Sequence, residues 1–189
     1  KRERYNKEIL IEENTNENDD DIVLNYTINE SAKYRICLYG PKAKNGGRGC
    51  VQCAERYFEN GSIIEYQLGG KTSGGEAGKQ CGTTTGNGNN GAGLSSANFS
   101  DEFYIVAGGG GGNSENGIRG GDCQQDGEGS LGGKGEKQNE TGTGGDNNAG
   151  DGKKGKGGNG GGGNTTQGIC CGGGGGSGYF GGGGGDGFS

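Results

Sequence analysis

Residues 103–112 read Phe-Tyr-Ile-Val-Ala-Gly-Gly-Gly-Gly-Gly, so a short apolar segment runs directly into a tract of glycine. Aromatic and β-branched residues favour a β-strand, whereas glycine weakens both strands and helices. Short apolar segments and glycine tracts recur along the chain, in which 53 of the 189 residues are glycine. The fold must therefore combine β-strands, here Phe103–Val106, with ordered or flexible glycine.

Other segments also have the composition of β-strands, and none has the sustained periodicity of a helix. The strand candidates are Glu8–Glu12, Asp21–Ile28, Tyr34–Tyr39 and Ser62–Leu68. Residues Asn29–Lys33 are expected to form the turn between the second and third of these, and the turn Glu59-Asn60-Gly61 opens the last. The sequence therefore predicts an all-β protein with almost no α-helix.

Glycine tracts lie between these strand candidates. They are Gly108–Gly112, Gly160–Gly163, Gly172–Gly176 and Gly181–Gly185. One interpretation is a set of flexible linkers. Their position between strands rather than between domains favours another, the extended polyglycine II helix with three residues per turn. Without Cβ atoms, several such helices can approach closely enough to hydrogen-bond one another, so we expect an inserted polyglycine II helix bundle.

The composition changes along the chain and divides it into parts. Residues 1–20 form an N-terminal arm, in which the apolar run Ile9, Leu10 and Ile11 precedes an acidic stretch that reads as a linker. This run is expected either to be donated to the sheet of a neighbouring molecule or to be an edge strand of its own domain. Residues 21–189 form the glycine-rich β domain.

Seven cysteines are spread over this domain. They are Cys37, Cys50, Cys53, Cys81, Cys123, Cys170 and Cys171. Only Cys50 and Cys53 form a C-x-x-C pair, and a zinc site needs a second close pair or histidine ligands. We therefore expect disulfides, with the odd cysteine free, bonded to another molecule or paired with a cysteine outside this sequence.

Sequons for N-linked glycosylation accompany the cysteines. They begin at Asn25, Asn29, Asn60, Asn98, Asn139 and Asn164. Sequons and disulfides together indicate a secreted or cell-surface protein that carries N-linked glycans.

Several function classes conflict with the composition. The net charge of −6 argues against nucleic acid as a partner. The sequence contains no run of 18 apolar residues, so we expect no membrane insertion. The absence of histidine removes the usual general base, so we expect neither an enzyme nor a cofactor. The nonapeptides at 172–180 and 181–189 fit a calcium-binding repeat, but only Asp186 supplies a carboxylate, which makes it a weak calcium candidate.

The order of the strand and glycine segments resembles the extracellular glycine-rich domain of anaplastic lymphoma kinase and leukocyte tyrosine kinase. The matching stretches are Tyr34–Gly49, Ile63–Gly78, Phe103–Gly112 and Cys170–Ser189, within about residues 21–189. The resemblance implies a jelly-roll-like β-sandwich joined to a polyglycine helix bundle that serves protein–protein recognition. A similar bundle occurs in some phage tail-tip adhesins. Because the chain has no kinase and no membrane span, the resemblance implies neither receptor signalling nor a particular ligand.

Two functions remain from this reasoning. The first is an extracellular structural protein, a subunit of a surface filament, coat or matrix that associates with itself or with another extracellular protein. The alternative is a recognition module, an adhesin or receptor ectodomain, that binds a protein or glycan through loops such as 82–100 and 127–159. A hydrolase is disfavoured because no base or carboxylate pair is evident.

Overall fold

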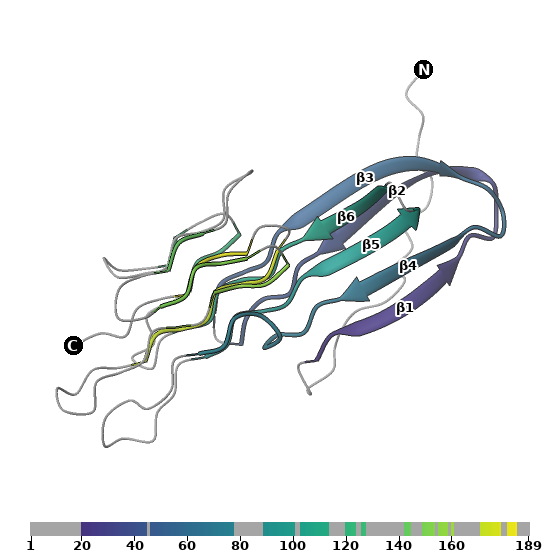
Figure 1. Ribbon diagram of the computed structural model, residues 1–189. Coiled ribbons are helices and arrows are strands. Elements are labelled where there is room, and N and C mark those ends of the chain that lie inside the picture. Colours follow the sequence, from purple (N-terminus) through teal and green to yellow (C-terminus); the bar gives the residue numbers. More distant parts are fainter. Residues whose placement is uncertain are drawn as a thin grey trace, which may run out of the picture.

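The described part of the chain is all-β. The computed structural model describes residues 20–44, 46–77, 89–100, 103–113, 120–123, 126–127, 142–144, 149–153, 155–158, 160, 171–178 and 181–184. They contain strands but no helix (Figure 1). The strands are β1 (Ile22–Thr27), β2 (Ala32–Tyr39), β3 (Val51–Phe58), β4 (Ile63–Leu68), β5 (Ser95–Ser100) and β6 (Phe103–Ala107). The expected all-β class is thus confirmed for these residues.

The strands form two antiparallel sheets. The larger sheet has the order β1-β4-β5-β6, and β2 pairs with β3 in the smaller one. The pair β2–β3 lies against β5 and β6. A single apolar core joins the sheets, with Leu38 and Phe58 from the smaller sheet and Ile64, Ala97 and Ile105 from the larger.

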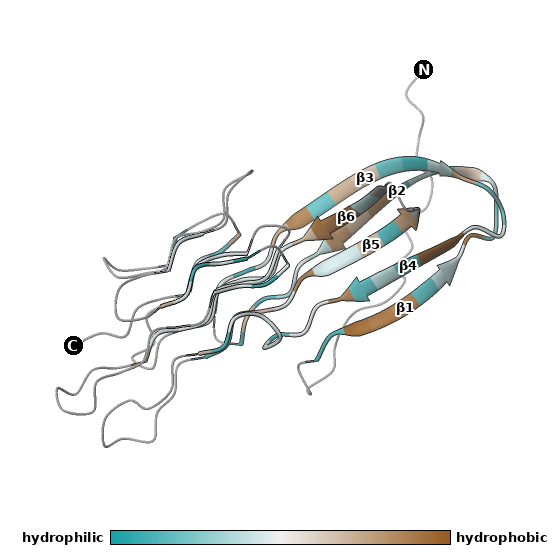
Figure 2. Ribbon diagram, in the orientation of Figure 1, coloured by the Kyte–Doolittle hydropathy of each residue, from teal (hydrophilic) through white to brown (hydrophobic). Residues whose placement is uncertain are grey.

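Alternating side chains place the strands around this core. In β1, Ile22, Leu24 and Tyr26 are half-buried, whereas the residues between them are exposed. Figure 2 shows the apolar residues concentrated on the strands. At the end of the sheets away from the glycine segments, Phe58 packs edge-on against Tyr34 and Phe99, with ring centroids 6.0 and 5.5 Å apart. This alternation is typical of strands with one face on a core.

Four strand predictions within the described residues are confirmed by β1, β2, β4 and β6. The structure corrects three other points. Residues 29–33 do not join paired strands, because β1 pairs with β4 and lies in a different sheet from β2. The predicted loop at 82–100 is wrong for Ser95–Ser100, which form β5, and β3 was not predicted at all. The candidate strand Glu8–Glu12 lies outside the described residues.

Glycine segments leave one end of the sheets. Residues 40–50, 69–77, 89–94 and 108–113 continue from strands or lead into them, and Figure 1 shows described segments from later in the chain beside them. We call the described residues of these four segments, together with those of 120–123, 142–144, 149–160 and 171–184, the glycine layer. It is attached to the sheets by continuous chain at several points.

Candidate functional site

The glycine layer is held by backbone hydrogen bonds between segments that are far apart in the sequence. Segment 171–178 shows this most fully. The Gly174 N–H donates to Asn89 O at 3.0 Å, and the Gly175 N–H donates to Gly158 O at 2.8 Å. In each of these hydrogen bonds the donor and the acceptor are more than fifteen residues apart in the sequence. The layer is therefore a tertiary structure rather than a series of local turns.

The hydrogen bonds of segment 171–178 repeat every third residue. Gly174 and Ser177 both donate to the segment 89–94, at Asn89 and Ala92. The same two residues also both accept, from Gly112 at 2.8 Å and from Gly109 at 2.7 Å. The residues between them bond to other segments.

Segment 108–113 follows the same rule. The N–H groups of Gly109 and Gly112 donate to segment 171–178, whereas those of Gly110 and Gly111 donate to Pro41 and Gly121. Each segment therefore presents its backbone groups in three directions, and each direction faces a different neighbour.

Adjacent segments approach too closely for side chains. A methyl group added at Gly174 would overlap the carbonyl oxygen of Gly75, and one added at Gly176 would overlap that of Gly109. The obstacle is backbone in both cases, which cannot rotate away as a side chain can. Glycine is therefore required at these positions by packing.

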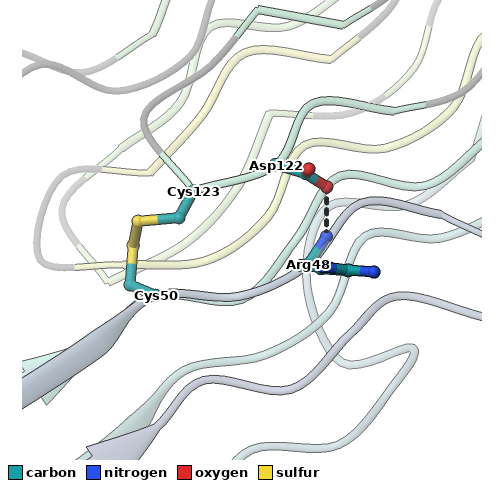
Figure 3. Close-up of a disulfide and its surroundings, with 4 residues drawn as sticks. All are labelled: Arg48, Cys50, Asp122 and Cys123. Carbon is teal, nitrogen blue, oxygen red and sulfur yellow. Dashed lines mark hydrogen bonds between the residues drawn. A yellow bond between two sulfur atoms is a disulfide. The ribbon is translucent and has the colours of Figure 1, made fainter.

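A disulfide links two segments of the glycine layer, 40–50 and 120–123 (Figure 3). Cys50, directly before β3, is bonded to Cys123, 73 residues later. Two hydrogen bonds flank it, because the Arg48 N–H donates to Asp122 Oδ1 at 2.7 Å and the Cys123 N–H donates to Arg48 O at 2.8 Å. The C-x-x-C pair is thus not a metal site: its two cysteines belong to different disulfides.

The other half of that pair, Cys53, is bonded to Cys37 across β2 and β3. Cys171 is fully buried in the glycine layer and is also disulfide-bonded. The expected disulfides are therefore present in the described residues. Cys81 and Cys170 lie outside them.

The Asp21 side chain connects the start of β1 to the end of β4 and to the glycine layer, a role that its sequence context does not predict. Its carboxylate accepts hydrogen bonds from the Gln67 side chain at 2.9 Å, the Gly70 N–H at 2.8 Å and the Ser73 hydroxyl. One residue before β1, it thereby fixes the point where β4 passes into the glycine layer. In the sequence it follows the acidic stretch and begins the strand candidate Asp21–Ile28, and nothing there indicates that it would bond to residues 67–73.

Four of the six sequons fall on described residues, and all four asparagines are exposed. Asn25 and Asn98 lie in one row across the larger sheet, because both pair with Glu65. Asn29 and Asn60 lie at the end of the sheets away from the glycine layer. These positions would leave attached glycans in solvent. Asn139 and Asn164 lie outside the described residues.

Neither a metal centre nor a membrane span is found where the structure is described. No three of its His, Cys, Asp or Glu side chains cluster as metal ligands would. None of its segments is a helix long and apolar enough to cross a membrane. The calcium candidate Asp186 and the arm residues Ile9, Leu10 and Ile11 lie outside the described ranges.

Comparisons with protein-family models, curated proteins and solved structures find no match to this chain.

Proposed function

We propose that this protein is an extracellular structural subunit, in which a β-sandwich carries a bundle of polyglycine II helices as a rigid block. The observation that supports this most strongly is the three-residue repeat of hydrogen bonds in the segments 108–113 and 171–178. A polyglycine II helix has three residues per turn and no internal hydrogen bonds, so its backbone groups point outward in three directions. The overall design is similar to the glycine-rich domain of the anaplastic lymphoma kinase type.

The energetics favour a rigid block over a linker. Ordering a residue costs about 1–2 kcal/mol of backbone entropy, and each net hydrogen bond returns about 1 kcal/mol. The remainder must come from burial and cross-links. A disulfide that closes a loop as long as that between Cys50 and Cys123 contributes about 4 kcal/mol in the chain-entropy model. A chain that meets these costs gains a stiff element, which suits a load-bearing or templating role.

The location we propose is outside the cell. Disulfides form and persist in oxidising compartments, and the structure contains the bonds Cys37–Cys53 and Cys50–Cys123. Exposed sequons on the larger sheet are compatible with N-linked glycans there.

One observation favours the alternative, a recognition module. Tyr39, Val51 and Tyr57 are 67, 55 and 59% exposed on the outer side of β2 and β3. Tyr39 and Val51 are direct cross-strand partners. Exposed aromatic residues are frequent anchors of protein interfaces, so this surface is where a protein ligand would bind.

Electron microscopy of the native, unreduced protein tests the proposal. We expect regular polymers, which should shorten or disperse when residues 1–20 are deleted. A reduced sample alongside shows whether disulfides between chains contribute. Discrete particles of one or two chains in every sample would contradict the structural role and leave the recognition module.

A further inference from the structure

In the described structure no strand pairs with the edge of β2 that faces away from β3, although at its end the Tyr39 C=O accepts a hydrogen bond from the Ser95 hydroxyl at 3.0 Å. β3 is the only partner strand of β2 there. The Gly40 N–H donates to Cys50 O at 2.8 Å, so position 40 and every second residue before it face β3. The close Cα–Cα distance of 4.1 Å between Cys37 and Cys53 agrees with this, because it marks a pair without ladder hydrogen bonds. The backbone N–H and C=O groups of Arg35 and Cys37 therefore point to the open edge.

The larger sheet extends beyond the area that β2 and β3 cover. β2 and β3 lie over β5 and β6, and among the described residues of β1 and β4 the core shared by the two sheets includes Tyr26, Ile64 and Tyr66 but not the residues nearer the glycine layer. Ile22, Leu24 and Leu68 lie on the inner face of β1 and β4, half-buried and outside the residues packed on the core. A strand added beside β2 would lie over these side chains.

We propose that this position accepts the segment Glu8–Glu12 from the arm of a second copy of the chain, which extends the smaller sheet by edge addition. The inference rests on the structural role proposed above and names the site through which it operates. Backbone hydrogen bonds to Arg35 and Cys37 supply affinity, and the alternate side chains of the arm supply specificity.

The arm has the pattern that this position requires. In an extended segment, Ile9 and Ile11 point to one side, and Glu8, Leu10 and Glu12 point to the other. With the isoleucines on the apolar inner face, the glutamates lie on the outer face. That face of β2 carries Arg35, together with Lys33, which is ion-paired with Glu55 of β3 at 3.3 Å. Hydropathy and charge therefore select the same orientation.

The linker favours a second copy over the arm's own domain. Six of the ten residues from Glu12 to Asp21 are acidic. Like charges in a linker repel one another and extend it, which carries the arm away from its own β1. Each copy has one arm and one β2 edge, so head-to-tail addition through this pair continues from chain to chain.

Complementary variants of the full-length chain test the site. Ile9→Asp places a charge on the inner side of the arm, and Leu10→Asp is the matched control on the outer side. Arg35→Pro removes an N–H from the open edge without removing a β2–β3 hydrogen bond. Circular dichroism and a non-reducing peptide map verify that each variant is folded with the Cys37–Cys53 and Cys50–Cys123 disulfides formed. Light scattering then gives the number of chains in each particle.

We expect Leu10→Asp to assemble like the unmodified chain, and Ile9→Asp and Arg35→Pro each to be monomeric, with association weakened at least tenfold. An equimolar mixture of the last two should give particles of two chains and no more, because one arm and one edge remain usable. Assembly of Ile9→Asp equal to that of Leu10→Asp, or no pairing in the mixture, would overturn the site.

Amide hydrogen exchange on the unmodified chain gives a result that does not depend on variants folding. The Arg35 and Cys37 amides should be protected in the assembled protein and should lose that protection on dilution. Protection that is independent of concentration would place the chain's own arm at the edge and overturn the proposal. Polymers that persist in Ile9→Asp would leave the structural role standing with another interface. An unmodified chain that forms no polymers would overturn both.

Discussion

Gly174 illustrates why single residues matter in the glycine layer. Its Cα faces the backbone of Gly75, and added side-chain volume would meet a carbonyl group there. We expect Gly174→Ala to lower the free energy of unfolding by about 3 kcal/mol, because overpacking against rigid backbone forces neighbouring segments apart. Chemical denaturation of the non-reduced protein measures this.

Gly111 provides the matched control, since a methyl group there would lie 3.1 Å from its nearest neighbour, Gly121 N. A shift of a few tenths of an ångström accommodates it. Gly111→Ala should therefore cost less than about 1 kcal/mol. Equal effects of the two substitutions would show that the close approach of segments is not what requires glycine.

At the scale of elements, the disulfide Cys50–Cys123 joins the segment directly before β3 to segment 120–123. We expect replacement of both cysteines by serine to lower the free energy of unfolding by about 4 kcal/mol, against about 3 kcal/mol for Cys37 and Cys53, whose loop is shorter. Only the first replacement should also loosen the glycine layer, as seen by limited proteolysis. Loss of protease resistance in the second variant alone would contradict this assignment.

The strands differ in how clearly the sequence specifies them. β1, β4 and β6 contain enough Ile, Val, Leu and aromatic residues to be predicted. β3 and β5 were not predicted: in β3 (VQCAERYF) the polar residues Gln, Glu and Arg interrupt the apolar ones and Val51 alone is β-branched, and β5 (SSANFS) is built from Ser, Ala, Asn and Phe. Their strand state depends on pairing with neighbours, which composition does not reveal.

The glycine layer, its disulfide and the open edge of β2 were predictable only in part. The glycine tracts and the disulfide chemistry follow from composition, but the pairing of Cys50 with Cys123 depends on the path of the chain. The open edge of β2 could not be predicted either. It follows from the sheet order: the chain passes from β1 in the larger sheet to β2 and β3, which form the smaller sheet, and then back to β4 in the larger one.

At the scale of the whole molecule, a two-sheet β body carries glycosylation sequons on its described surface and a glycine layer at one end. The functional difference between a building block and a tether depends on whether that layer is rigid. A rigid layer fixes the spacing between neighbouring chains, whereas a flexible one would only limit it. The proposed head-to-tail assembly needs a rigid layer.

Native-state amide hydrogen exchange of the unreduced protein, read at Gly109–Gly112 and Gly174–Ser177, tests this directly. We predict that the amides of Gly109–Gly112, Gly174, Gly175 and Ser177 are protected about as strongly as those of β4 and β5, because they donate to carbonyl groups of other segments. Exchange at the rate of an unstructured glycine peptide, with the strands still protected, would show that the tracts are linkers and would contradict the role of a rigid structural subunit.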